Sequence, residues 1–518
     1  MNIVRLWPLG VLAALTAVFA VLNLSLSARH GTLAMPPIYD DVGYLLDSAR
    51  RMTIERGDSV VGLVQSFLNR PPHAPLSTLL AMTGYAVFGH HVWAPYALNA
   101  TVLLAYTVLM YFVARKQQAT TLQSLLITFI LLYPPVVHAI VTEFRPDIAA
   151  GMIFAAAIYL LIQADLTKIG GAPRIAVALV CAFAVVAKPS AFVVTVPMLG
   201  ASLLISVACL GHQWRAGIRP ALGLVGIALV VLVPYVIIWG RQVYEYVYQV
   251  FVTNSDVWRT GGTHFYHAIY HSFGDGGAHA LGLFVPIGLA TILADLVMSF
   301  KRNFDRRVAA FYIVIAVTYA GMSTAGDKSA YQGAFFYMPF LLAICVSIAR
   351  LAANLTGIGR WALIAIAGIV AITAPPATTF TYANRYPNAK AMAAELVDYT
   401  ERELSRCGYR AATIVGIAPY PVTPDAIALQ LMLEKGADMS VQQPFLVRDL
   451  DHMISVAMSS DFILLPNSWG REISSYLPGT QFVDDVRARV METGEWSSFR
   501  PNVEDPPEIL SRTNCKRL

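Results

Sequence analysis

The sequence is poor in charge. Only 13% of its 518 residues are Asp, Glu, Lys or Arg, whereas about 25% is usual for a soluble globular protein. Apolar residues make up 56% of the chain, and the mean hydropathy is +0.57. This composition excludes an ordinary soluble fold and predicts a membrane protein. The net charge of +5 is small and does not indicate a nucleic-acid partner.

Cysteine is scarce as well, with five residues in the chain. Cys181, Cys209 and Cys345 fall in or beside apolar runs, where cysteine usually behaves as a small apolar residue. Cys407 and Cys515 fall in the polar C-terminal part. A disulfide between them is a hypothesis for an oxidising compartment, since pairing cannot be deduced from sequence.

Apolar runs of membrane-spanning length recur through the first 380 residues. The first covers residues 8–27, and ten more lie near 91–113, 121–140, 147–163, 174–187, 189–209, 220–240, 279–299, 308–323, 333–350 and 361–378. A membrane helix needs about 20 apolar residues, so we predict a polytopic α-helical protein with about eleven transmembrane helices. Residues 1–29 also fit a cleaved signal peptide, but their apolar stretch is long for one and favours a retained helix.

Lys and Arg concentrate in alternate loops, which predicts the orientation of the helices. If the N-terminus is cytoplasmic, the cytoplasmic loops hold Arg115, Lys116, Lys168, Arg174, Arg215, Arg219, Lys301, Arg302, Arg306, Arg307, Arg350 and Arg360. The external loop 28–90 breaks the pattern with five arginines, and we take that excess as functional. An odd number of spans then places the C-terminal part outside the cytoplasm too.

The C-terminal residues 380–518 have ordinary polar composition and are long enough for one domain. We predict strands at 412–417 and 462–466 and helices at 424–433 and 448–458. Alternating strands and helices indicate a small extracytoplasmic α/β domain after a membrane domain of residues 1–379. Without a glycine-rich phosphate loop or nucleophile motif, this domain is expected to be structural or to position an acceptor.

An acidic pair, Asp40-Asp41, follows the first apolar run and the helix-breaking Pro36-Pro37. A helix starting near Asp40 would put most of a small polar set on one face: Asp40, Asp41, Tyr44, Asp47 and Arg51. Asp40 would serve equally as a helix N-cap or as an ionised base, because capping hydrogen bonds keep a carboxylate charged.

The same external loop ends in Arg70-Pro71-Pro72-His73-Ala74-Pro75-Leu76, which leads into a helix predicted over 75–89. Dense prolines favour a rigid, extended segment. They would hold Arg70 and His73 at a set height, although His73 is also explained as a helix-entry residue.

Charges at the ends of two later apolar runs fall on the same predicted side. Glu143-Phe144-Arg145-Pro146-Asp147 precedes one run, and Lys188-Pro189 separates two others. Ionisable residues at such positions are functional candidates. Pairing of Arg145 with Asp147 or Glu143, and snorkelling of Lys188, are the structural alternatives.

The predicted external loop 241–278 is rich in aromatic residues and histidine. His264, His267 and His271 would share one helix face, a spacing that can hold a metal. Only the more distant Asp256 and Asp275 could complete such a site. An interfacial aromatic belt and a lid touching sugar or lipid are the alternatives. The lid would use Trp258, His264, Tyr266 and His267.

Together these segments resemble the GT-C glycosyltransferases, nearest to the protein O-mannosyltransferases and the bacterial aminoarabinose and lipopolysaccharide-core sugar transferases. Asp40-Asp41-Val42-Gly43-Tyr44 is similar to the family's Asp-Glu-x-x-Tyr element, and His73-Ala74-Pro75-Leu76 to its His-Pro-Pro-Leu. Ala187-Lys188-Pro189-Ser190 is similar to its Thr-Lys-Gly-Pro turn. The resemblance covers about the first 200 residues and the overall layout.

The resemblance implies an inverting glycosyltransferase of a bacterial inner membrane. The donor would be a polyprenyl-phosphate sugar, and the acceptor a hydroxyl of a lipid-linked glycan, lipid A, wall polysaccharide or protein on the periplasmic face. Asp40 would be the general base, and Asp41 is the second catalytic candidate. The phosphate-binding or substrate-binding set would be Lys188, Arg145, Arg51, Arg70, His73, Tyr44, Glu143 and Asp147.

No cofactor is predicted firmly, although some relatives use a divalent cation beside the acidic pair. One alternative is a secondary transporter, which usually has an internal repeat that this chain lacks. The others are a polymerase or ligase of lipid-linked glycans, which relies on a large outward loop late in the chain, and a non-catalytic protein of glycan assembly.

Overall fold

The computed structural model describes residues 6–37, 39–58, 60–301, 304–326, 328–355, 357–373, 388–409, 411–417 and 422–515. Within these ranges the side chains of residues 39, 40, 54–58, 251, 370, 372 and 373 lie outside the description. The predicted boundary between residues 379 and 380 also lies outside the described residues.

Helices dominate the chain up to residue 373. Their bounds are α1 (Trp7–His30), α2 (Tyr39–Asp58), α3 (Val60–Asn69), α4 (Pro75–Phe88), α5 (Ala94–Lys116), α6 (Thr121–Ile130), α7 (Pro135–Thr142), α8 (Pro146–Gln163), α9 (Gly171–Val186), α10 (Phe192–Ala208), α11 (Trp214–Tyr248), α12 (Ser255–Trp258), α13 (His264–Ile269), α14 (Asp275–Ala280), α15 (Phe284–Lys301), α16 (Arg306–Ser323), α17 (Ala334–Asn354) and α18 (Ile358–Thr373).

Among the described residues, seven helical segments are long and apolar enough to cross a membrane: Trp7–His30, Ala94–Lys116, Pro146–Gln163, Pro189–Ala208, Gly211–Tyr248, Phe284–Lys301 and Ala334–Asn354. An eighth is formed if α6 and α7, which meet at 75°, count as one broken span. The expected total of about eleven is therefore not confirmed. Helix α9 and the described apolar part of α18 are shorter than a span, and α16 begins with two arginines.

Helix α17 is the centre of the bundle, since 94% of its most apolar window is buried inside the protein. Helix α8 packs beside it, and Gly151 allows the close approach. A Cβ added to Gly151 would lie 2.6 Å from the carbonyl oxygen of Ala334, a distance that real Cβ atoms essentially never show. Small residues permit such helix contacts within membranes. The start of α8 is thereby held against the start of α17.

Helix α11 is unusually long. Its 35 residues extend about 52 Å at 1.5 Å per residue, well beyond the roughly 30 Å of bilayer hydrocarbon. Its exposed apolar side chains include Val230, Val236 and Ile237, as expected for a face turned to lipid.

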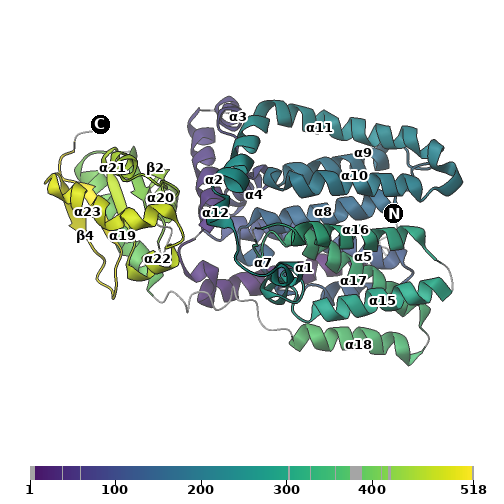
Figure 1. Ribbon diagram of the computed structural model, residues 1–518. Coiled ribbons are helices and arrows are strands. Elements are labelled where there is room, and N and C mark those ends of the chain that lie inside the picture. The colour runs from purple at the N-terminus through teal and green to yellow at the C-terminus, as the bar shows by residue number, and fades with distance from the viewer. Residues whose placement is uncertain are drawn as a thin grey trace.

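The C-terminal part is a separate α/β unit at one end of the bundle (Figure 1). Its elements are α19 (Ala389–Arg406), β1 (Ala411–Gly416), α20 (Pro424–Lys435), β2 (Asp438–Gln442), α21 (Leu450–Met458), β3 (Phe462–Leu465), α22 (Ser468–Ile473), α23 (Val483–Glu492), β4 (Trp496–Phe499) and β5 (Glu508–Arg512). The strand order is β2-β1-β3-β5-β4, with β2, β1 and β3 parallel and the other two pairings antiparallel. The predicted α/β character, with both strands and both helices, is confirmed to within two residues at each end.

Helix α2 joins this unit to the bundle. Val42, Leu45 and Ala49 of α2 share one buried apolar cluster with residues of α19, α20 and β1. At the rim Arg50 pairs with Asp438 at 3.1 Å. The element that begins with the acidic pair is therefore packed directly on the C-terminal unit.

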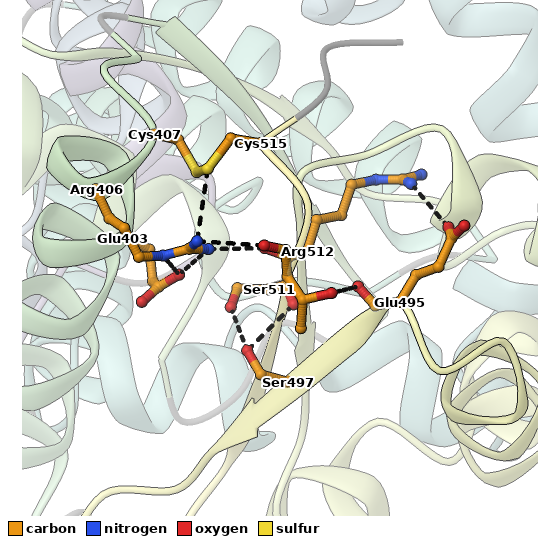
Figure 2. Close-up of a disulfide and its surroundings, with 9 residues drawn as sticks. Glu403, Arg406, Cys407, Glu495, Ser497, Ser511, Arg512 and Cys515 are labelled. Atoms are coloured by element: carbon orange, nitrogen blue, oxygen red, sulfur yellow. Dashed lines mark hydrogen bonds and ion pairs between the residues drawn. A yellow bond between two sulfur atoms is a disulfide. The ribbon is translucent and has the colours of Figure 1, made fainter.

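The unit is closed by a disulfide between Cys407 and Cys515, which ties the end of α19 to the segment after β5 (Figure 2). Beside it the Arg406 guanidinium contacts Glu403 Oε2 at 2.8 Å and donates to the Arg512 carbonyl oxygen at 3.1 Å. The cysteine pair left open by the sequence is thus bonded in the structure.

Candidate active site

The acidic pair lies in the first turn of α2, which begins at Tyr39, directly after the Pro36-Pro37 segment. The side chain of Asp40 lies outside the described residues. Asp41 is 7% exposed, and its Oδ2 accepts a hydrogen bond from the backbone N–H of Phe144 at 2.7 Å. The first loop is thereby attached to the segment between α7 and α8.

That segment brings two further charges to Asp41. Arg145 Nε lies 3.5 Å from Asp41 Oδ1 and 4.0 Å from Glu143 Oε2, and all three side chains are largely buried. On its other side the Arg145 guanidinium stacks on the ring of Tyr331 at 3.9 Å, a cation–π contact. Two carboxylates thus share one guanidinium in a site mostly closed to water.

Glu143 is the carboxyl group most affected by this arrangement. Burial, opposed by Arg145 and by a hydrogen bond from Tyr331 and reinforced by Asp41, raises the pKa of Glu143 to about 7. A titratable group with a pKa near neutrality in a charged, buried cluster is a functional-site signal.

A second ion pair begins in the same segment. Lys188, between α9 and α10, donates to Asp147 Oδ1 in the first turn of α8, and the Asp147 side chain is buried. Asp147 therefore pairs with Lys188, 41 residues away, rather than with Arg145, the structural alternative drawn from the sequence. Lys188 retains 17% side-chain exposure.

The arginines of the first loop lie elsewhere. Arg51 is 3% exposed and donates to Asp47, Ser66 and the Arg70 carbonyl oxygen. Its guanidinium also stacks on Phe67 at 4.3 Å. Arg51 thus links α2, α3 and the segment around Arg70 through hydrogen bonds. The side chain of Arg70 itself is exposed.

His73 sits between two aromatic rings. Its ring lies 6.1 Å from that of Tyr44, which is buried on α2, and 4.2 Å from that of Tyr246 at the end of α11. The His73 side chain is exposed. These contacts connect the acid-bearing helix to the long helix α11.

The histidines of residues 264–271 do not share a helix face, because α13 ends at Ile269. His264 is exposed, whereas His271 is buried and shares a 3.1 Å hydrogen bond with the Tyr337 hydroxyl. Tyr266 donates to Asp275 at 3.2 Å, and the Nδ1 atom of half-buried His267 has no hydrogen-bond partner among the described residues.

Trp258 ends α12, and its ring lies 6.4 Å from that of Tyr476 in the C-terminal unit. Nearby, Arg448 and Asp256 form a 2.7 Å ion pair between the same two parts. Of the predicted lid residues, Trp258 is thus placed against the C-terminal unit.

No three His, Cys, Asp or Glu side chains come together as a metal site among the described residues. Asp41 is instead engaged by the Phe144 amide and Arg145.

Tyr331 and Tyr96 are site residues that the sequence did not predict. The Tyr96 ring packs edge-on against Phe144 at 5.5 Å, beside the two carboxylates. Tyr331 lies in a short loop before an apolar run, without a recognisable motif. Lys328, an isolated cation three residues before Tyr331, was the one available signal for that loop.

Membrane-length helices, an acid-bearing first loop and a C-terminal α/β unit at the same end define a polytopic membrane protein of GT-C-like fold. Two solved structures of ArnT from Cupriavidus metallidurans, an aminoarabinose transferase of the GT-C family, have this fold. The apo structure is 13% identical with a TM-score of 0.59, covering 98% of each chain. The structure bound to undecaprenyl phosphate is 12% identical with a TM-score of 0.56, covering 97% of each chain.

No family model and no curated protein matches the sequence. At such low identity the two structures show the fold alone. The resemblance seen in the sequence motifs and the fold of the whole chain nevertheless agree.

Proposed function

We propose that this protein is an inverting glycosyltransferase that moves a sugar from a polyprenyl-phosphate donor to a hydroxyl group. The observation that carries the proposal is the buried cluster of Asp41, Glu143 and Arg145 at the end of an ArnT-like bundle where α2 meets the C-terminal unit. One of the two ArnT structures holds undecaprenyl phosphate, a lipid of the class proposed as carrier here.

Asp40 is the proposed general base. It would take the proton from the acceptor hydroxyl while that oxygen attacks the anomeric carbon, so a single displacement inverts the configuration. Asp41 is held by the Phe144 amide and Arg145. We therefore give it a positioning role, in which it attaches the start of α2 to the cationic segment.

The leaving group in this reaction is a lipid phosphate, whose developing negative charge requires nearby cations. Arg145 and Lys188 are the proposed cations, because Arg145 lies 3.5 Å from Asp41 and Lys188 pairs with Asp147, two residues after Arg145. Their carboxylate partners hold them in place before the donor arrives. Arg51 already donates hydrogen bonds to Asp47, Ser66 and the Arg70 carbonyl oxygen within its own loop. We therefore do not count it among the residues that bind the donor.

The reaction is proposed for the extracytoplasmic face of a bacterial inner membrane, with the N-terminus in the cytoplasm. The helix ends that carry Arg115, Lys116, Arg306 and Arg307 lie opposite the proposed site, in keeping with positive-inside orientation. The proposed acceptor hydroxyl belongs to a lipid-linked glycan, lipid A, a wall polysaccharide or a protein.

The test is transfer from radiolabelled polyprenyl-phosphate sugars by the purified full-length protein, with membrane-lipid extracts as acceptors. We expect transfer by the wild type and its loss in Asp40→Asn, because the amide keeps the shape of the side chain but cannot take a proton. Donor binding should survive this substitution.

The matched control is Asp165→Asn, which changes a partly exposed carboxylate just after α8, at the end of that helix opposite Asp147, and should transfer like the wild type. Unchanged turnover in Asp40→Asn would remove Asp40 from the mechanism. No consumption of any donor by folded wild type would favour a transporter or a non-catalytic assembly protein instead.

A further inference from the structure

The cluster at the proposed site is unbalanced in charge. Asp41 and Glu143 are each 7% exposed, and Arg145 is the cation that lies within 4.0 Å of both. Among the described side chains of this cluster, two ionised carboxylates beside one guanidinium leave a net negative charge in a poorly hydrated site. Burial of an uncompensated charge is costly, and the usual remedy is uptake of a proton.

The contacts indicate which carboxylate takes that proton. Asp41 has the shorter distance to Arg145 and also accepts from the Phe144 amide at 2.7 Å, so its ionised form is well stabilised. Glu143 lies farther from the guanidinium and is hydrogen-bonded by the Tyr331 hydroxyl. Glu143 is therefore the group that changes charge near neutral pH, in keeping with its pKa of about 7.

The groups facing Glu143 come from four parts of the chain. Arg145 lies in the same segment, Asp41 on α2, Tyr331 before α17 and Tyr96 on α5. Burial raises the pKa of Tyr331 well above its usual value, so this phenol stays neutral in the working range. Arginine stays charged throughout. The change in the charge of this cluster between pH 6 and 8 is thus expected to come from Glu143.

We propose that Glu143 is a proton-coupled positioning residue, which takes up a proton from water when the donor phosphate binds beside Arg145. This inference rests on the proposed function. With Glu143 ionised, Arg145 is shared between two carboxylates and the incoming phosphate meets a net negative cluster. With Glu143 neutral, the Arg145 guanidinium forms ion pairs with Asp41 and the phosphate alone. The lipid phosphate and the Glu143 carboxylate therefore compete for one guanidinium.

The coupling has a definite sign and size. A phosphate anion near the cluster favours the neutral form of Glu143, so binding is tightest below pH 7 and weakens as pH rises above it. Coulomb's law with an effective dielectric constant of about 20 and a separation of about 10 Å gives roughly a tenfold change in Kd.

The probe is a methyl ester of undecaprenyl phosphate, a phosphodiester like the proposed donor, which itself does not titrate between pH 5.5 and 8.5. Binding to the full-length protein in detergent is measured across this range. We expect the Kd of the wild type to rise about tenfold. Glu143→Gln should keep the tight, low-pH value throughout, because its side chain mimics the neutral acid.

The matched control is Glu245→Gln, at the end of α11, where an exposed carboxylate pairs with Arg241. It should follow the wild-type curve. A second measurement requires no variant: calorimetry of wild-type binding at pH 8 in two buffers of different ionisation enthalpy. Proton uptake makes the apparent binding enthalpy differ between the buffers.

The outcomes separate the two proposals. Binding that is independent of pH, or equally dependent in Glu143→Gln, together with equal enthalpies in both buffers, overturns the role of Glu143 and leaves the proposed function standing. No binding of the diester by folded wild type at any pH contradicts the proposed donor class, and the inference about Glu143 falls with it.

Discussion

Two buried clusters of arginine and carboxylate lie at opposite ends of the helix bundle, and they are built differently. At the end remote from the C-terminal unit, Arg350 Nε lies 2.8 and 3.0 Å from the two oxygens of Asp295, which is 1% exposed. Tyr312 donates to the same carboxylate at 2.9 Å, and Arg350 Nη2 donates to Ser299 at 2.8 Å. A further carboxylate, Asp305, lies 3.5 Å from Nη1 but is itself exposed to solvent.

At the proposed site the same residue types meet at 3.5 and 4.0 Å, and both carboxylates of the cluster are buried. The remote cluster matches one buried charge with one opposite charge and satisfies it with hydrogen bonds. Among its described side chains, the site cluster has one carboxylate more than it has cations. Removing one partner of a matched buried pair leaves an uncompensated charge and destabilises the fold. A buried carboxyl group with a pKa near neutrality in a charged cluster is instead typical of sites that do chemistry.

The largest expected effect is at the matched cluster. Arg350→Met leaves Asp295 buried without its cation, which should cost about 3–5 kcal/mol of unfolding free energy. Thermal unfolding in detergent measures this loss, while the surviving folded fraction should still transfer sugar. The double variant Arg350→Met with Asp295→Leu should recover most of the stability, and a cost below about 1 kcal/mol for the single variant would refute the matching argument.

Glu508 of β5 tests the same idea outside the membrane. Burial raises its pKa, but hydrogen bonds from Arg487, Ser498 and Arg500 outweigh burial and hold the pKa of Glu508 at about 2. Because this pKa is lower than the usual carboxyl value of 4.5, Glu508 stabilises the folded state at pH values above 4.5. The contribution is lost as the pH falls toward 2. Glu508→Gln should cost about 2 kcal/mol at pH 7 and much less at pH 2.5. Equal cost at both pH values would contradict this account.

Arg145→Met is the counterpart of the Arg350 substitution at the site. We expect a smaller stability cost of about 1–2 kcal/mol, because Glu143 can take up a proton and the Phe144 amide still serves Asp41. Activity should fall at least about a hundredfold, since the leaving phosphate loses a cation. Thermal unfolding and initial transfer rates, measured together on both methionine variants, give the comparison. Equal costs in stability would erase the distinction between the two ends.

The smallest effect is expected for Glu143→Gln on stability. The raised pKa means that the folded protein binds a proton more tightly than the unfolded chain, so wild-type stability declines as pH rises from about 4.5 to about 7. The glutamine variant lacks this decline and should be the more stable of the two proteins at pH 8. Parallel unfolding curves at pH 5 and 8 for the two proteins measure the difference, and an unvarying difference would contradict it.

Local patterns predicted the local structure well. The proline pair followed by polar residues at helical spacing predicted the start of α2, and short apolar runs predicted β1 and β3. The number of spans was harder to predict, because apolarity alone does not reveal the bend between α6 and α7 or the shortness of α9. The pairing of Lys188 with Asp147 depends on how α8, α9 and α10 pack, and no local pattern encodes it. The same applies to Tyr331, which becomes part of the site only because Gly151 lets α8 and α17 approach each other.

The length of α11 ties the proposed site to the thickness of the membrane. A helix of this length in a bilayer of about 30 Å projects by roughly 20 Å on one side or the other. Its final turns contact His73 through Tyr246, and the segment that follows reaches the C-terminal unit through Asp256 and Arg448. A thinner or thicker bilayer shifts or tilts such a helix to relieve hydrophobic mismatch. Such a shift would displace the Tyr246–His73 and Asp256–Arg448 contacts. The geometry of the proposed site would therefore depend on the length of the lipid chains.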